Sequence, residues 1–229
     1  IFMRTRPALC FILGLGCFSA AQADIIGVKG SVDYWKYNSD LSSALGQPEM
    51  KDDASLSFAL AVEHPVPLLP NVKIKHSTLE AESEREVLNE KMERIDLDYS
   101  DFIVYYEILD NIVSADIGVG AKVLDGTVQQ NLTEVEQVSE TLPMLYAEAG
   151  VKLPFTGLSA KAEASYAKFD DTVISDAQAE LKYNFIDNLL VDVGLKAGYR
   201  ILNIELDDYE KNDLKFDFKG PYIGIDIHF

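Results

Sequence analysis

The chain has little of several residue types on which protein chemistry depends. Its 229 residues include two cysteines, three histidines and one tryptophan. Both cysteines, Cys10 and Cys17, lie near the start, so the segment 24–229 can form no disulfide and offers no thiolate for catalysis or metal binding. Cofactor classes that need cysteine ligands are therefore excluded from this segment, and no motif indicates another cofactor.

Positive charge and long hydrophobic runs are also scarce. Lys and Arg number 20 against 38 Asp and Glu, a formal net charge of −18, which excludes a nucleic-acid binder because phosphate neutralisation needs an excess of cations. The one long apolar run, residues 8–20, is shorter than the roughly 20 residues that a membrane-spanning helix needs. The sequence thus excludes a bundle of membrane helices.

Residues 1–23 have the pattern of a signal peptide. Arg4 and Arg6 give a positive start, the apolar run follows, and Ala21-Gln22-Ala23 is the small-x-small pattern that signal peptidase cleaves. We expect cleavage after Ala23 and a single domain over residues 24–229. A lipoprotein anchored through Cys17 is the weaker alternative, because the residues before that cysteine match a lipobox only in part.

Alternation of apolar and polar residues dominates the rest of the chain and predicts half-buried strands. In segment 54–63, for example, Leu56, Phe58, Leu60 and Val62 share one face. Ten such segments are predicted: 25–37, 54–63, 71–79, 95–107, 112–124, 142–153, 158–169, 174–185, 189–204 and 214–229. Most reach the roughly 9–11 residues that a tilted strand needs to cross a bilayer.

The connections between these segments are alternately short and long. Short turns are predicted at 64–70, 108–111, 154–157 and 186–188, and long loops at 38–53, 80–94, 125–141 and 205–213, with a short one at 170–173. This is the plan of an outer-membrane barrel, whose backbone groups must all pair within the protein. We therefore predict an all-β fold, a single closed antiparallel transmembrane β-barrel with ten strands in an up-and-down meander; eight strands is the alternative. A bulge or a shift of phase is expected at Asp101, where the apolar alternation of its segment is interrupted.

The face opposite the apolar one carries charges of both signs in balance. Because buried charges must be paired, this balance predicts ion pairs across a plugged or very narrow lumen. The residues expected in that lumen are Lys29, Asp33, Glu63, Lys73, Lys75, Asp116, Lys122, Glu148, Lys152, Lys161, Glu163, Asp176, Glu180, Lys182, Asp192, Lys196, Arg200 and Asp226. The pattern also allows the inverse arrangement, a soluble lipocalin-like barrel with the apolar face around a ligand, although the strand lengths argue against it.

The end of the chain resembles the terminal targeting strand of bacterial outer-membrane proteins. The residues concerned are Tyr222, Gly224, Ile227 and the terminal Phe229. With Gly27-Val28-Lys29-Gly30, Tyr34-Trp35, segment 105–111 and Gly220-Pro221-Tyr222, the chain is similar to the small outer-membrane β-barrel protein families of Gram-negative bacteria. The resemblance implies an outer-membrane location and the barrel-assembly machinery and periplasmic chaperones as biogenesis partners. It carries no catalytic residues.

Candidate chemistry is sparse. His64 falls in a predicted short turn, His76 on the predicted lipid side, and His228 beside the end of the chain, so no nucleophile–base pair is indicated and we expect no enzyme. Asp207, Asp208, Glu210 and Asp213 form a carboxylate cluster that could bind a divalent cation, but solvated loop charge is the simpler reading. Aromatic residues at strand ends are expected in the interfacial girdles or, on the lumen face, in the interior: Tyr34, Trp35, Tyr37, Tyr99, Tyr105, Tyr166, Tyr183 and Phe185.

Three functions follow from this pattern. The first is an integral outer-membrane barrel without a catalytic site, with a structural or surface-interaction role through acidic extracellular loops, in contact with membrane lipid and lipopolysaccharide as a monomer. The second is a narrow porin, favoured by lumen-face glycines that leave space: Gly118, Gly120, Gly150, Gly194 and Gly198. The third is a soluble periplasmic ligand-binding barrel.

Overall fold

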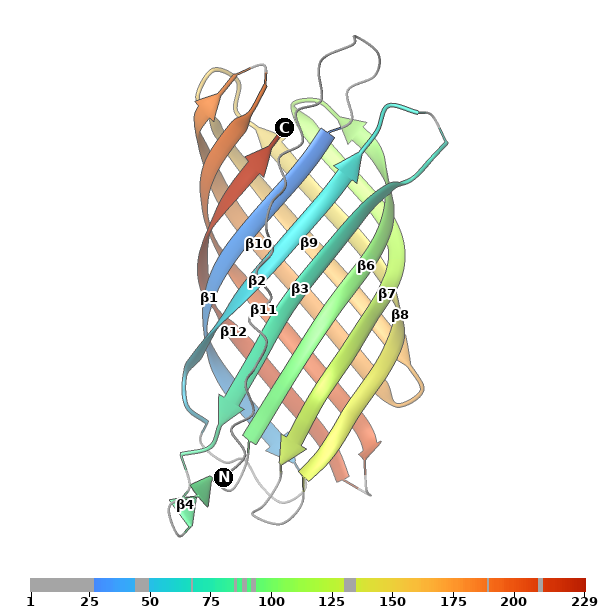
Figure 1. Ribbon diagram of the computed structural model, residues 1–229, viewed down its shortest axis with the longest axis vertical. Helices are drawn as coiled ribbons and strands as arrows, with labels where there is room; N and C mark the ends of the chain where they lie inside the picture. The colour runs from blue at the N-terminus through green and yellow to red at the C-terminus, as the bar shows by residue number, and fades with distance from the viewer. Residues whose placement is uncertain are drawn as a thin grey trace, which may run out of the picture.

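The chain folds into one closed β-barrel, shown in Figure 1. The computed structural model describes residues 27–229 except 44–49, 67, 85, 88–89, 92–93, 130–134, 189 and 210–211. The expected signal peptide, residues 1–23, lies outside the described residues. Among those described, no helix is long and apolar enough to span a membrane.

Ten long strands make the barrel wall. In chain order they are β1 (Gly27–Ser43), β2 (Asp53–Glu63), β3 (Asn71–Glu82), β6 (Arg94–Asp110), β7 (Val113–Gln129), β8 (Val135–Lys152), β9 (Leu158–Phe169), β10 (Thr172–Asp187), β11 (Asp192–Tyr209) and β12 (Asn212–His228). The two short strands β4 (Glu86–Val87) and β5 (Glu90–Lys91) pair only with each other.

Each strand pairs antiparallel with its neighbours, and β12 returns to pair with β1. The last backbone bonds of this seam join Phe229 and Val28 in both directions. We call the end that carries the connections 64–70, 111–112, 153–157 and 188–191 the turn end, at the top of Figure 1, and the opposite end the loop end. The prediction of a ten-stranded antiparallel meander is confirmed, and the eight-stranded alternative is wrong.

Several predicted loops are largely strand. Most of the predicted loop 125–141 belongs to β7 and β8, β1 continues to Ser43, and most of 205–213 belongs to β11 and β12. The segment 80–94 holds the end of β3, the β4–β5 hairpin and the first residue of β6, not a single loop. The barrel wall is therefore taller at the loop end than the sequence pattern indicated.

The reason is a reversal of polarity along several of the strands, β6 among them. On β6, Ile95, Leu97 and Tyr99 point inward near the loop end, whereas Phe102 and Val104 point outward nearer the turn end. The side chains that alternate as apolar are at odd positions near the loop end and at even positions nearer the turn end. A strand predicted from one continuous apolar face therefore ends where the positions change. We call the part of the wall near the loop end, at the bottom of Figure 1, the upper wall, and the part near the turn end the lower wall; above and below are used in the same sense. The upper wall has an apolar inside and a polar outside, as in a soluble barrel, and the lower wall has the opposite arrangement.

The bulge predicted at Asp101 is wrong. The register between β6 and β7 is continuous from Arg94 to Glu107, and Asp101 lies directly opposite Lys122. The register shifts later, between Glu107 and Leu109, at the turn end. The interruption at Asp101 marks the height at which polarity reverses, not an extra residue in the strand.

An outward-facing apolar belt surrounds the lower wall. Aliphatic side chains such as Leu60, Ile74 and Ile225 are about half exposed on its surface. Of the aromatic residues predicted for the girdles, Tyr34, Tyr166, Tyr183 and Phe185 lie on the belt, whereas Trp35, Tyr37, Tyr99 and Tyr105 are buried inside the barrel. The outward aromatic residues therefore fit the interfacial position, and the inward ones belong to the core.

Candidate functional site

The most distinctive site is a layer of charged side chains that fills the lumen of the lower wall. Its members occupy alternate, inward-facing positions of the strands, because successive side chains of a strand point to opposite faces. We call them the charged layer: Lys29, Asp33, Glu63, Lys73, Lys75, Asp101, Asp116, Lys122, Glu148, Lys161, Glu163, Asp176, Glu180, Lys182, Lys196, Arg200 and Asp226.

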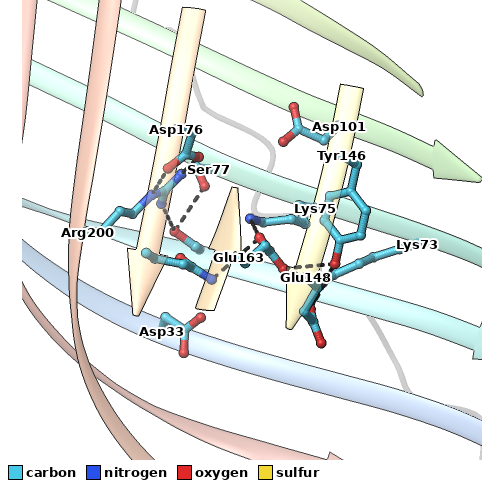
Figure 2. A network of polar contacts seen from close by, with 12 residues as sticks. Asp33, Lys73, Lys75, Ser77, Asp101, Tyr146, Glu148, Glu163, Asp176 and Arg200 are labelled. Atoms are coloured by element: carbon cyan, nitrogen blue, oxygen red, sulfur yellow. Dashed lines mark hydrogen bonds and ion pairs between the residues drawn. The ribbon is translucent and has the colours of Figure 1, made fainter. Parts of the chain in front are cut away.

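Glu163 of β9 is at the centre of this layer. Figure 2 shows its carboxylate between two lysines of β3: Lys73 Nζ lies 2.5 Å from Oε2, and Lys75 also donates a hydrogen bond to the carboxylate. Lys73 Nζ further donates to the hydroxyl of Tyr146 at 2.8 Å and lies 3.1 Å from Glu148 Oε2. Strand β3 is thereby tied across the lumen to β8 and β9.

A second cluster joins the other side of the barrel. Lys161 Nζ lies 3.6 Å from Glu148 Oε2 and 3.4 Å from Glu180 Oε1, so it links the two clusters. Lys196 Nζ lies 2.9 Å from Asp33 Oδ1 and 3.5 Å from Glu180 Oε2. The hydroxyl of Tyr222 donates to Glu180 at 2.6 Å. These contacts connect β1, β8, β9, β10, β11 and β12.

The upper edge of the charged layer is formed by two buried ion pairs. Arg200 on β11 donates to Asp176 on β10 through Nε at 2.9 Å and through Nη2, and it also donates to the hydroxyl of Tyr99. Its guanidinium carbon lies 4.7 Å from the centre of the Trp35 ring. Lys122 Nζ donates to Asp101 at 2.6 Å and lies 4.3 Å from the Tyr99 ring centre. Aromatic rings thus cover both cations from above.

The remaining residues predicted for the lumen lie towards the turn end. Lys29 Nζ is 2.6 Å from Glu63, and Lys182 Nζ is 2.7 Å from Asp226. Asp192 lies at the rim, with His228 Nδ1 3.9 Å from its carboxylate. Lys152 is exposed at the end of β8, and Asp116 is buried without an ion pair to any described residue. The structure thus brings together most of the predicted set but not Lys152, and Asp116 lies among the set without an ion pair to a described residue.

Sequence reasoning missed several members of this network. The sequence pattern predicts only an irregularity at Asp101, and it indicates no polar role for Tyr99, Tyr146 and Tyr222, which the structure shows in hydrogen bonds. The signal for Asp101 is its odd position in β6, in phase with the inward residues Tyr99 and Ile103. The hydrogen bonds of the tyrosines depend on neighbours far apart in the chain, which no local pattern reports.

Above the charged layer the lumen is filled by apolar side chains. We call these the apolar layer: Trp35, Tyr37, Leu41, Leu79, Ile95, Leu97, Leu124, Val128, Val138, Leu142, Met144, Ile174, Leu202, Ile204, Leu206, Phe216 and Phe218. Tyr37 and Phe218 meet edge to face with ring centres 5.5 Å apart. Within the charged layer, hollows of about 60 and 10 Å³ remain. Buried side chains of the two layers thus occupy the lumen.

The lumen-face glycines do not leave the space expected for a pore. A Cβ atom at Gly198 would lie 2.7 Å from the Tyr222 ring, and one at Gly118 would lie 2.8 Å from the Tyr105 Cβ. Neighbouring side chains and backbone likewise occupy the positions beside Gly120, Gly150 and Gly194. These glycines allow close approach of adjacent groups, so they do not support the narrow-porin interpretation.

The sites considered for metal binding and catalysis are separate from this layer. The side chains of 207–214, with the candidates Asp207, Asp208, Glu210 and Asp213, lie outside the described residues. Within the part of the chain that is described, no three His, Cys, Asp or Glu side chains are placed to hold a metal ion. His76 faces outward beside Ser100, His64 lies in a connection of the turn end, and His228 lies at the end of β12.

The predicted assembly signal lies on the last strand, β12. Tyr222 and Gly224 face the lumen, while Ile227 lies on the outer side and Phe229 is exposed at the turn end. A Cβ at Gly224 would contact Asp33 and the backbone of Val32, which explains a glycine at this position beside β1. The apolar side chains Ile223 and Ile225 continue the outer belt across the seam.

Comparisons with known proteins identify similar barrels but no family. No family model matches the chain, and no curated protein matches it. The outer membrane protease OmpT from Escherichia coli is a similar solved structure, with a TM-score of 0.45, 7% identity, and 89% of this chain and 97% of that chain covered. Neisserial surface protein A is similar with a TM-score of 0.36, 10% identity, and 91% and 100% covered.

A third similar structure is Ail, the attachment invasion locus protein of Yersinia pestis. Its TM-score is 0.33 at 15% identity, with 88% of this chain and 98% of that chain covered. The architecture of this chain, a closed ten-stranded meander with an outward apolar belt, fits the plan of an outer-membrane barrel.

Proposed function

We propose that the chain is an integral outer-membrane barrel that does not conduct solutes and acts through the wall and loops that it projects above the membrane. The observation that carries this proposal is the reversal of polarity on the barrel strands. The lower wall has the apolar exterior that lipid requires, and the upper wall has the polar exterior that water requires. We place the turn end in the periplasm and the loop end outside the cell.

The closed lumen supports a structural or surface-interaction role over a porin. A conducting barrel needs a continuous aqueous path, whereas here the charged layer is followed by the apolar layer. Purified protein in planar lipid bilayers is expected to give no stepwise current. Regular, voltage-independent conductance steps from the folded protein would favour the porin alternative.

The projecting wall offers an acidic surface for that role. On its outer face, Asp98 lies opposite Asp125 and Glu80 lies opposite Asp96 in the strand register. Like charges placed directly opposite destabilise a sheet, so these carboxylate pairs lower the stability of the upper wall. We expect contacts with lipopolysaccharide and with cationic partners there, and no catalytic activity.

Fractionation tests the location. The full-length protein, expressed in a Gram-negative host, is expected in the outer-membrane fraction, to resist extraction by alkaline carbonate, and to migrate differently on gels before and after heating. Recovery from the soluble periplasm with heat-independent migration would contradict the proposal and favour the soluble ligand-binding barrel.

A further inference from the structure

An open cavity lies at the turn end of the barrel, below the charged layer. Its volume is about 340 Å³, within the range of ligand pockets. We call it the vestibule. It is lined by Glu63, Glu107, Asp110 and Asp192, by His64 and His228, and by the apolar side chains of Pro65, Leu190, Val191 and Phe229. The charge of its lining is therefore mainly negative.

A smaller hollow of about 60 Å³ lies deeper in the lumen, and Glu63 lines both spaces. Asp116 of β7 lines this hollow with only 9% of its surface exposed. Its neighbours directly across the strands are Glu107 on β6 and Glu148 on β8. Asp116 thus stands in a row of three carboxylates, an arrangement that costs stability unless positive charge compensates it.

No cation of the charged layer among the described residues forms an ion pair with Asp116. Lys29 pairs with Glu63, and Lys73 and Lys161 share Glu148. Asp116 forms no hydrogen bond or ion pair with a described residue. A carboxylate that is nine-tenths buried and unpaired is costly, so a further positive charge beside Asp116 would stabilise this end of the lumen.

Two further acceptors in the vestibule lack a donor among the described residues. His64 Nε2 lies 3.1 Å from the carbonyl oxygen of Pro70, which can only accept, so Nε2 carries a proton; in the neutral ring Nδ1 is then an acceptor, and it is buried without a partner among the described residues. Asp192 Oδ1 is also buried without a hydrogen-bond partner. The unsatisfied groups at this end are all acceptors, so the complementary ligand is a positively charged donor.

We propose that the vestibule and the hollow above it bind an organic diamine or polyamine. One ammonium group would enter the hollow beside Asp116, and a second would lie in the vestibule near Asp192 and His64. The methylene chain between them would lie against Leu190 and Val191. An ammonium group has three N–H donors and can bind acceptors that lie apart from one another. A metal ion needs ligands that converge on one point, and the described carboxylates and histidines do not do so.

Calorimetric titration of the full folded barrel in non-ionic detergent micelles tests this assignment. Spermidine is expected to bind more tightly than butylamine, which has one ammonium group, and more tightly than Mg²⁺. Asp116→Asn is expected to weaken spermidine binding by about tenfold or more, since it removes a charge-assisted hydrogen bond. Asp192→Asn is expected to weaken it less, because Asp192 is nearer to bulk water.

The matched control is Asp98→Asn combined with Asp125→Asn, which removes carboxylates from the outer wall and not from the lumen. This variant is expected to bind spermidine as the unmodified chain does. Asp116→Asn is expected to fold, shown by heat-modifiable migration, and to unfold at a higher temperature than the unmodified chain without ligand, since it relieves the carboxylate row. Spermidine should raise the unfolding temperature of the unmodified chain but not of Asp116→Asn.

Four results would overturn the proposal, three of them comparisons between variants or ligands. The first is an unchanged affinity in Asp116→Asn, the second is equal or tighter binding of Mg²⁺, and the third is a loss in the outer-wall control as large as in Asp116→Asn. No binding of spermidine to the unmodified chain would also overturn it. None of these results depends on whether the protein conducts or on the role of its outer wall.

Discussion

Lys122 and Asp101 form an ion pair between directly opposite positions of β7 and β6, at the boundary between the charged and apolar layers. Lys122 Nζ lies 2.6 Å from Asp101 Oδ1, and each side chain is only 1% exposed. Above the pair, the ring of Tyr99 covers the ammonium group. Both charges are therefore removed from water and depend on each other.

Replacement of one partner of this pair should be costly. We expect Lys122→Met to lower the free energy of unfolding by about 3–5 kcal/mol, because it leaves the Asp101 carboxylate buried and unpaired. Equilibrium unfolding by urea in detergent micelles measures this. The double variant Lys122→Met/Asp101→Leu should recover most of the loss, since an apolar pair can replace a buried ion pair. A single variant as stable as the unmodified chain would contradict the account.

The height of the membrane boundary can be tested on one strand. Val32 and Asn38 both face outward on β1, Val32 in the apolar belt and Asn38 above it. We expect Val32→Lys to destabilise the folded barrel in lipid by about 2–4 kcal/mol, the cost of a lysine on the lipid face. Asn38→Lys, the matched control, should be neutral. Equal tolerance of both changes, measured by folding into lipid vesicles, would place the boundary elsewhere.

The glycine under Tyr222 gives a third prediction. A Cβ at Gly198 would lie 2.7 Å from the Tyr222 ring, whose hydroxyl donates to Glu180, whereas a Cβ at Gly30 would make only an ordinary contact, with the Ala59 carbonyl oxygen at 4.0 Å. Gly198→Ala should therefore cost about 1–3 kcal/mol by overpacking. Gly30→Ala should be close to neutral. Heat-modifiable migration over a temperature series compares the two variants, and a reversed order would be inconsistent with this packing.

The apolar layer should behave as a protein core and not as a lipid-facing surface. Leu142 is fully buried in the upper lumen, and Leu60 faces outward on the belt. Leu142→Ala should lower the free energy of unfolding by about 2–5 kcal/mol, because it leaves a cavity in a packed interior. Leu60→Ala should cost less, since lipid chains adapt to the smaller surface. A larger loss for Leu60→Ala, measured by urea unfolding, would argue against an apolar layer inside the barrel.

The sequence predicts the lower wall of the barrel well, because apolar residues alternate with polar ones there along each predicted segment. On segment 54–63, for example, apolar residues at even positions face outward in the structure. The upper wall was predicted as loops, because on strands such as β6 the apolar residues change to odd positions at Asp101. To predict that change, one must know at which height of the wall the lipid ends. That height depends on the whole barrel and not on one strand.

The partners within the charged layer could be predicted only as a set. The balance of charge indicates that Glu163 is paired, but the choice of Lys73 and Lys75 depends on the stagger of β3 relative to β9 across the lumen. The unpaired state of Asp116 has no sequence signal at all, since its strand pattern is the same as that of its paired neighbours. Closure of the barrel, not local periodicity, decides these contacts.

Spin-label accessibility on β12 tests the central claim most directly, because the segment 24–229 has no cysteine and a single label can be placed anywhere on it. Ile223→Cys and Lys219→Cys both carry the label outward, one on the belt and one on the projecting wall. In lipid bilayers, the label at 223 should be accessible to oxygen and shielded from a water-soluble nickel complex, and the label at 219 should show the reverse. Equal access of the nickel complex to both sites would contradict a membrane-spanning lower wall.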